Sequence, residues 1–140
     1  MRKPFLKWAG NKHRILEHIL PLIGSPQTFC EPFAGSCAVA LNVNAQRYLI
    51  NDINADLINL YKYLTNPNDD SFIQYCGDFF RPEFNDKEEY ISLRKFFNQS
   101  TDTLERSRLF VYLNRHCFNG LTRYNSKGGF NVPFGKMKNP

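Results

Sequence analysis

The stretch Thr28–Asn54, TFCEPFAGSCAVALNVNAQRYLINDIN, decides the fold class of this chain. Residues 28–33 predict a β-strand that runs into a turn at Ala34 and Gly35. A short helix is expected over 38–44, followed by a second strand over 47–50 that ends at Asn51 and Asp52. Strand, tight turn, helix and strand in this order are typical of an open, mostly parallel sheet. The sequence therefore predicts an α/β protein.

The segments on either side of this stretch favour helices. Apolar residues at helical spacing predict a helix over 15–23, ended by Pro21 and Gly24, and another after the capping residue Asn54. Beyond Asn66 the alternation of strands and helices stops. The elements expected there are helices over 88–97 and 104–117 and a β-hairpin over 125–132. Because two strands cannot complete a sheet, we expect part of the sheet to lie outside this chain.

Composition excludes several classes of protein. The chain has 140 residues, of which 42% are hydrophobic and 15% aromatic, enough for the core of one domain with or without an insertion. No apolar run reaches the roughly 18 residues of a membrane span, and no secretory segment follows the N-terminus. The four cysteines form no CxxC pair, so neither a metal site nor a disulfide framework is expected. We expect a cytoplasmic protein with no membrane partner.

Basic residues are concentrated at the two ends of the chain. Residues 1–14 hold five Lys or Arg and residues 106–140 hold seven, without any acid, whereas 15–105 hold six basic against thirteen acidic residues. Such ends predict a positive surface that attracts nucleic acid. Aromatic side chains that stack on bases are expected among them. The interleaved aromatics are Phe110, Tyr112, Phe118, Tyr124, Phe130 and Phe134. Ordinary solvated Lys and Arg side chains are the alternative interpretation.

The turn after the first strand is the first candidate binding site. Gly35 permits a tight turn and close approach of a ligand to the main chain, and the following helix would offer free N–H groups. Asp52 ends the second strand, where a carboxylate accepts the hydroxyls of a bound ribose in such folds. The full GxGxxG pattern is absent, because Cys37 stands where a second glycine is expected. A plain turn with a surface aspartate is the alternative.

Two further motifs combine basic, aromatic and amide side chains. In FLKWAGNK (5–12) the only tryptophan, Trp8, lies between two lysines. It either belongs to a binding site or anchors the N-terminal arm to the core. In NGLTRYN (119–125) a turn presents an amide, an arginine and an aromatic ring, the groups that read and stack on bases. An Asn-Gly turn with an exposed arginine is the alternative there.

Together these segments resemble the N-terminal half of the Dam-type DNA adenine-N6 methyltransferases. The matching motifs, in collinear order, are FLKWAGNK (5–12), EPFAGSCAV (31–39), NDIN (51–54) and YLNRHCFNGLTRYNSKGGFNVPFGK (112–136). The resemblance implies a Rossmann-like sheet that binds S-adenosyl-L-methionine, with a helical target-recognition domain inserted after the second strand. It implies a cofactor domain over 1–66 and a DNA-recognition domain over 67–140. It also implies an enzyme from a bacterium or phage that acts on duplex DNA. The sequence does not give the oligomeric state, and we expect a monomer.

The resemblance assigns roles to two groups of residues. The cofactor group is Trp8, Lys12, Phe33, Gly35, Ser36 and Asp52. The DNA group is Lys7, Phe118, Asn119, Leu121, Arg123 and Pro133. Within the second group, Arg123 is expected to contact a guanine, with apolar side chains on a thymine methyl and Phe118 or Asn119 filling the gap left by a flipped base. The implied target is GATC. Cys37 and Met137 depart from the family pattern.

The family carries out its chemistry with an Asp-Pro-Pro-Tyr motif, and this sequence contains none. That motif accepts the N–H bonds of the flipped adenine and so directs its lone pair toward the methyl group. No catalytic residue is therefore assigned here, and we expect the chain to be the front part of an enzyme, inactive alone. Two other functions are open: a DNA-binding module without cofactor, and an enzyme of different chemistry, such as an RNA or small-molecule methyltransferase.

Overall fold

The computed structural model describes residues 1–66 and 71–140. They form a mixed α/β chain that divides into two compact units, Met1–Ala55 and Asp56–Pro140. The boundary expected at Asn66 lies one helix later in the chain than this division. Among the described residues, no helix has the length and apolar character needed to cross a membrane.

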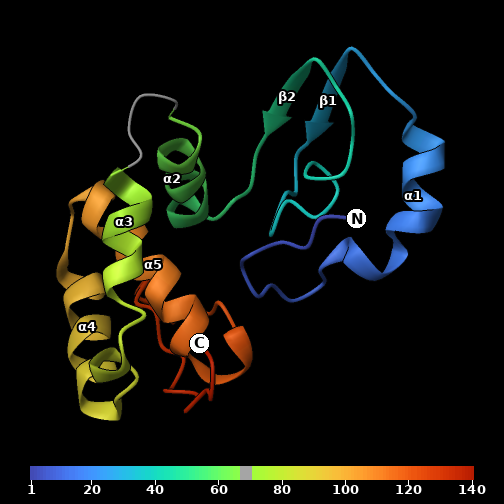
Figure 1. Ribbon diagram of the computed structural model, residues 1–140. Helices are drawn as coiled ribbons and strands as arrows, with labels where there is room; N and C mark the ends of the chain where they lie inside the picture. The colour runs from blue at the N-terminus through green and yellow to red at the C-terminus, as the bar shows by residue number, and fades with distance from the viewer. Residues whose placement is uncertain (67–70) are drawn as a thin grey trace. The chain divides into compact units, whose positions relative to one another are not determined.

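The first unit is built on two parallel strands, β1 (Thr28–Glu31) and β2 (Arg47–Ile50), with Thr28 opposite Arg47 and Glu31 opposite Ile50 (Figure 1). The parallel pairing and the second strand agree with the sequence. The first strand is shorter than expected, because Pro32 has no amide to continue the ladder. Since the described sheet has two strands, the larger Rossmann-like sheet stays a prediction.

The expected helix over 38–44 is wrong. Residues 35–42 form successive turns, and two side chains take the backbone groups that a helix would use. The Ala40 amide donates to the Glu31 carboxylate at 3.0 Å, and the Asn42 side chain donates to the Ala38 carbonyl at 2.9 Å. Cys37 also has a φ of 56°, which is left-handed backbone. Side-chain competition for backbone groups therefore prevents a regular helix.

A helix that precedes β1 in the chain packs against the segment between β1 and β2. The 3₁₀ turn Lys12–Ile15 leads into α1 (Leu16–Ile23), and Leu16 packs with Val39 and Val43 in the core of the first unit. The helix ends at Gly24, whose amide donates to the Leu20 carbonyl. The helix does not end at Pro21, which lies inside it. Because Pro21 is exposed, the backbone hydrogen bond that it cannot donate leaves no buried polar group unpaired.

The second unit is a group of helices around α5 (Thr103–His116). The helix α5 is buried along most of its length and packs against α3 (Ser71–Asp78) and α4 (Lys87–Gln99), as Figure 1 shows. The helix α2 (Ala55–Leu64) joins them through Tyr63, which stacks on Phe72. Asp86 and Asp102 cap α4 and α5 by accepting backbone amides. The expected helices over 88–97 and 104–117 are confirmed within a few residues; α3 was not expected.

The aromatic residues near the C-terminal end serve mainly as core. Phe110, Tyr112 and Phe130 are buried in the second unit, and the exposed aromatic among the six is Phe118. The expected hairpin over 125–132 is also reduced to a single antiparallel bridge, between Tyr124 and Phe130. Extended strands do not form, because side chains of α4 bind the backbone of this segment in place of a partner strand.

Candidate functional site

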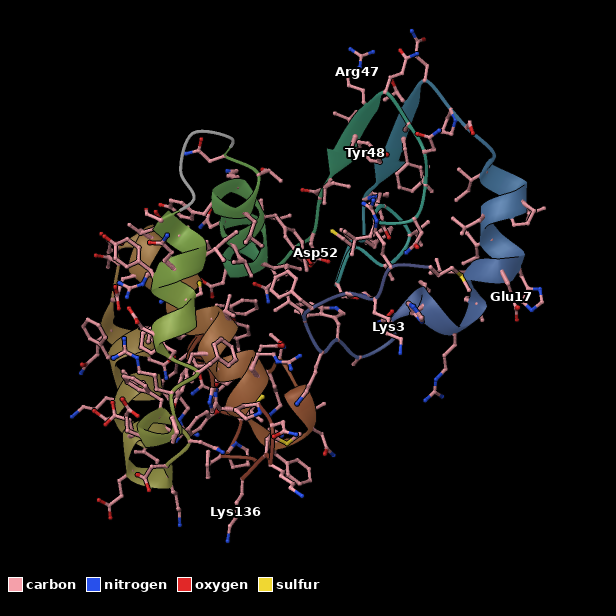
Figure 2. All side chains as sticks on the ribbon, in the orientation of Figure 1. Lys3, Glu17, Arg47, Tyr48, Asp52 and Lys136 are labelled. Carbon is pink, nitrogen blue, oxygen red and sulfur yellow. The ribbon has the colours of Figure 1, made fainter. Side chains whose placement is uncertain are left out.

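A pocket of about 440 Å³ opens in the first unit at the carboxyl ends of β1 and β2. Figure 2 shows Asp52 where the chain leaves β2. The volume of this pocket is in the range of small-molecule sites. The structure brings together here every residue of the expected cofactor group: Trp8, Lys12, Phe33, Gly35, Ser36 and Asp52.

Asp52 holds the glycine turn to the end of the second strand. Its Oδ2 accepts the Gly35 amide at 2.9 Å, and its Oδ1 accepts the Asn54 amide at 3.0 Å. The Ala34 amide donates to the Asn51 carbonyl at 2.9 Å beside it. Both carboxylate oxygens are thus oriented by the backbone, and each keeps a second lone pair for a ligand hydroxyl.

Gly35 is required by the tryptophan packed against it. The residue has a φ of 49°, and a Cβ at this position would lie 2.7 Å from both Cδ1 and Nε1 of Trp8. A real Cβ atom does not approach a ring so closely, so only glycine fits without displacing the indole. The close approach that the sequence predicted for a ligand is therefore used, at least in part, by the protein's own Trp8.

Glu31 is a pocket residue that the sequence reasoning did not assign. Glu31 is the last residue of β1, so it lies at the same edge of the sheet as Asp52, which follows β2. The Glu31 carboxylate accepts the Ala40 amide. Burial raises the pKa of Glu31 above its ordinary value, although the Ala40 hydrogen bond and the positive charge of Lys12 oppose the rise. The signal that would have found it is its position: parallel strands end at the same edge of a sheet.

The remaining residues of the cofactor group differ in exposure. Phe33 is 89% exposed at the pocket rim, whereas Ser36 is buried. Lys12 donates from Nζ to the Gly10 carbonyl at 2.8 Å. Cys37, at the position of the missing second glycine, adopts a positive φ that glycine would adopt without strain.

The expected DNA group divides between the two units. Lys7 belongs to the first unit and is half-buried. The other five residues lie in the second unit after α5, and each is exposed: Phe118, Asn119, Leu121, Arg123 and Pro133. The segment 118–135, called the recognition loop below, therefore presents the expected groups on the surface of its unit.

One face of α4 anchors the recognition loop. Tyr90, Arg94 and Asn98 lie four residues apart and so share a helix face. Tyr90 and Arg94 both donate to the Val132 carbonyl, at 2.9 and 2.8 Å. Asn98 donates to the Phe130 carbonyl at 3.1 Å and accepts the Phe130 amide at 2.8 Å. Burial raises the pKa of Tyr90 above its ordinary value, which alone already keeps the hydroxyl protonated and able to donate at neutral pH.

Arg123 is oriented across the recognition loop. Its Nε donates to Oδ1 of Asn131 at 2.8 Å, and the backbone amide of Asn131 donates to the Arg123 carbonyl at 3.1 Å. The guanidinium is exposed, so part of its donor fork faces solvent. An oriented, exposed guanidinium is suited to a bidentate contact with a base edge or a phosphate.

These features match a known family. Residues 8–140 match the D12 class N6 adenine-specific DNA methyltransferases. The chain belongs to this family. The D12 class match extends from the tryptophan motif through the recognition loop, so both parts of the candidate site fall within it.

Similar proteins include relatives that are named DNA adenine methylase. The chain is 49% identical to that of Vibrio cholerae serotype O1 over 140 residues, 45% to that of Serratia marcescens over 138, and 44% to that of Escherichia coli strain K12 over 138. Each match covers 99% of this chain and between 49% and 51% of the relative. The chain thus spans about half the length of the curated relatives it matches.

Proposed function

We propose that the protein represented by this chain transfers a methyl group from S-adenosyl-L-methionine to N6 of adenine in duplex DNA, at GATC sites. In this proposal residues 8–52 supply the cofactor pocket and the recognition loop supplies contacts to DNA. Membership of the D12 class supports the reaction. The observation that carries the proposal is the gathering of the six expected cofactor residues around one pocket.

The pocket is chemically suited to this cofactor. The Trp8 indole forms an apolar wall, and the Asp52 oxygens can accept ribose hydroxyls. Glu31 and Lys12 provide one group of each sign for a zwitterionic amino-acid tail. When bound, S-adenosylmethionine supplies an electrophilic methyl group on a sulfonium centre. This chain's own residues position the cofactor; no residue of the chain is assigned to polarise the adenine amine, because Asp-Pro-Pro-Tyr is absent.

The recognition loop is proposed to read DNA in the major groove. Arg123 would make a bidentate contact to guanine O6 and N7, and Leu121 and Pro133 would contact a thymine methyl. Phe118 or Asn119 would fill the space left by a flipped adenine. Lys7 is proposed to face the same DNA. The exposure of the five second-unit residues and the bracing of Arg123 by Asn131 support these roles.

Direct binding measurements on the 140-residue chain test the proposal. Because Trp8 is the only tryptophan and lines the pocket, its fluorescence should change on titration with S-adenosylmethionine and not with NAD. Binding to a GATC duplex should be tighter than binding to a scrambled duplex, at a stated salt concentration. Salt-sensitive DNA binding with no response to S-adenosylmethionine would overturn the proposal in favour of a DNA-binding module. Equal affinity for RNA and for duplex DNA would favour a methyltransferase of different chemistry.

A further inference from the structure

A largely buried ion pair contacts the recognition loop through Tyr124. Arg106 on α5 donates from Nε and Nη2 to the two carboxylate oxygens of Asp56 on α2, both at 2.8 Å. The side chains are only 22% and 12% exposed. This bidentate, desolvated geometry is the strong form of the arginine–carboxylate interaction.

The other donors of Arg106 bind the end of α4. Its Nη1 donates to the carbonyls of Phe97 and Ser100, at 2.8 and 3.1 Å, and its guanidinium lies 4.2 Å from the centroid of the Phe97 ring. Arg106 thus joins α2, α4 and α5, and its guanidinium has little freedom to move. A buried pair with such complete hydrogen bonding fixes the position of the carboxylate it holds.

The carboxylate held in this way binds the recognition loop. The Tyr124 hydroxyl donates to Oδ2 of Asp56 at 2.8 Å, and its ring packs edge-on against Phe130 at 5.7 Å. Phe130 in turn packs against Phe97, the ring that lies on Arg106. The tyrosine is therefore held at its hydroxyl by the ion pair and along its ring by the core.

Tyr124 is next in the chain to Arg123, and the two belong to consecutive cross-loop pairs. Tyr124 faces Phe130 in the antiparallel bridge, and Arg123 faces Asn131 through the hydrogen bonds described above. A shift of Tyr124 would move the Arg123 backbone with it. Conversely, fixing the Tyr124 hydroxyl fixes where the Arg123 side chain begins.

We infer that Asp56, Arg106 and Tyr124 form a positioning relay that sets the placement of Arg123 for sequence-specific reading of DNA. The inference rests on the proposed function, because it assigns to these three residues the orientation of a proposed DNA contact. Asp56 and Arg106 are half-buried and act through Tyr124, so they are positioning residues and not contact residues. Their charges also cancel one another, so Arg106 adds no net charge to the surface.

Tyr124→Phe in the full 140-residue chain tests the relay, because it removes the hydroxyl and keeps the ring that packs on Phe130. Tyr63→Phe is a matched control: the Tyr63 hydroxyl also bonds a side-chain oxygen, that of Thr103 at 2.8 Å, away from the recognition loop. We expect amide hydrogen exchange at Asn131 to become about tenfold faster in Tyr124→Phe, the effect of losing one hydrogen bond to a charged acceptor. It should stay unchanged in Tyr63→Phe. Unchanged exchange in Tyr124→Phe, or equal acceleration in both variants, would overturn the relay.

A DNA-binding comparison separates the relay from the proposed function. Tyr124→Phe should reduce the preference for a GATC duplex over a scrambled one by about fivefold, the lower end of what one bidentate base contact contributes. In an Arg123→Ala background it should have no further effect, which a purely structural role would not explain. If the unmodified chain discriminates and Tyr124→Phe discriminates equally, the relay is wrong. If the unmodified chain shows no preference, the proposed function fails, and the exchange measurement still decides the positioning.

Discussion

Gly35→Ala should disturb the candidate cofactor pocket at the contact between the glycine turn and the indole. The backbone at Gly35 has a φ of 49°, which costs an L-residue about 1–2 kcal/mol. The new Cβ would also lie 2.7 Å from two atoms of Trp8, so the ring must move. Overpacking of this kind costs about 1–3 kcal/mol more. We therefore expect the free energy of unfolding to fall by about 2–5 kcal/mol in total.

The assay uses the sole tryptophan as its own reporter. Urea unfolding followed by Trp8 fluorescence measures the free energy, and the native emission maximum reports whether the indole has moved toward water. Gly24→Ala is the control in the same unit: its φ is 64°, and no atom lies within 4 Å of the added Cβ. The control should lose stability through its backbone alone and keep the native emission spectrum.

The result that would refute this reasoning is specific. If Gly35→Ala kept the native emission maximum and its free energy of unfolding fell by less than about 2 kcal/mol, the indole would not be packed on the turn as described. A shifted spectrum together with weaker binding of S-adenosylmethionine would link the turn to the proposed cofactor. A shifted spectrum with unchanged affinity would retain the packing and remove Gly35 from the cofactor site.

Asp52→Ala should weaken binding of S-adenosylmethionine on the order of tenfold or more, because two backbone amides lose a charged acceptor. An unchanged dissociation constant measured by calorimetry would remove Asp52 from the site. Arg123→Ala should weaken binding to a GATC duplex by about 1–3 kcal/mol and relax specificity at one base pair. Arg81→Ala, at an exposed ion pair, should do neither. Equal losses of binding free energy on specific and scrambled duplexes in a titration would assign Arg123 to phosphate contact. Burial raises the pKa of the Cys76 thiol from 9.0 to about 11, so its contribution to stability is complete below pH 9 and is lost as the pH rises toward 11, because only the unfolded thiol ionises there. Urea midpoints across this range should show a decline that is smaller in Cys76→Ala, and identical slopes would contradict it.

The pocket could be predicted from sequence because its main parts follow local rules. A glycine after one strand and an aspartate after the next must lie near each other once the strands pair in parallel, and the observed pairing of β1 with β2 places them within one hydrogen bond. The contact of Trp8 with Gly35 had no such signal. It joins the N-terminal arm to the turn, and no periodicity in the sequence relates the two.

Predictions that depended on backbone competition were less successful. The helix expected over 38–44 failed because Glu31, which lies outside the expected helix, and Asn42, which lies within it, bind backbone groups that a helix needs. The hairpin over 125–132 was reduced to one bridge because α4 supplies the hydrogen bonds. Helix α3 was missed although Phe72, Cys76 and Phe79 recur at helical spacing.

By itself, the sequence determined the class of the chain, the parallel strand pair, most helices and the motifs that mark its family, because each depends on residues near one another in the chain. Only the tertiary structure decided what the charges and aromatic rings do. Arg106 and Arg108, counted in the basic C-terminal end, pair with Asp56 and Glu105, and Phe110 lies in the core. Whether a charge faces solvent or a carboxylate depends on which distant segment packs beside it, and composition carries no information about that partner.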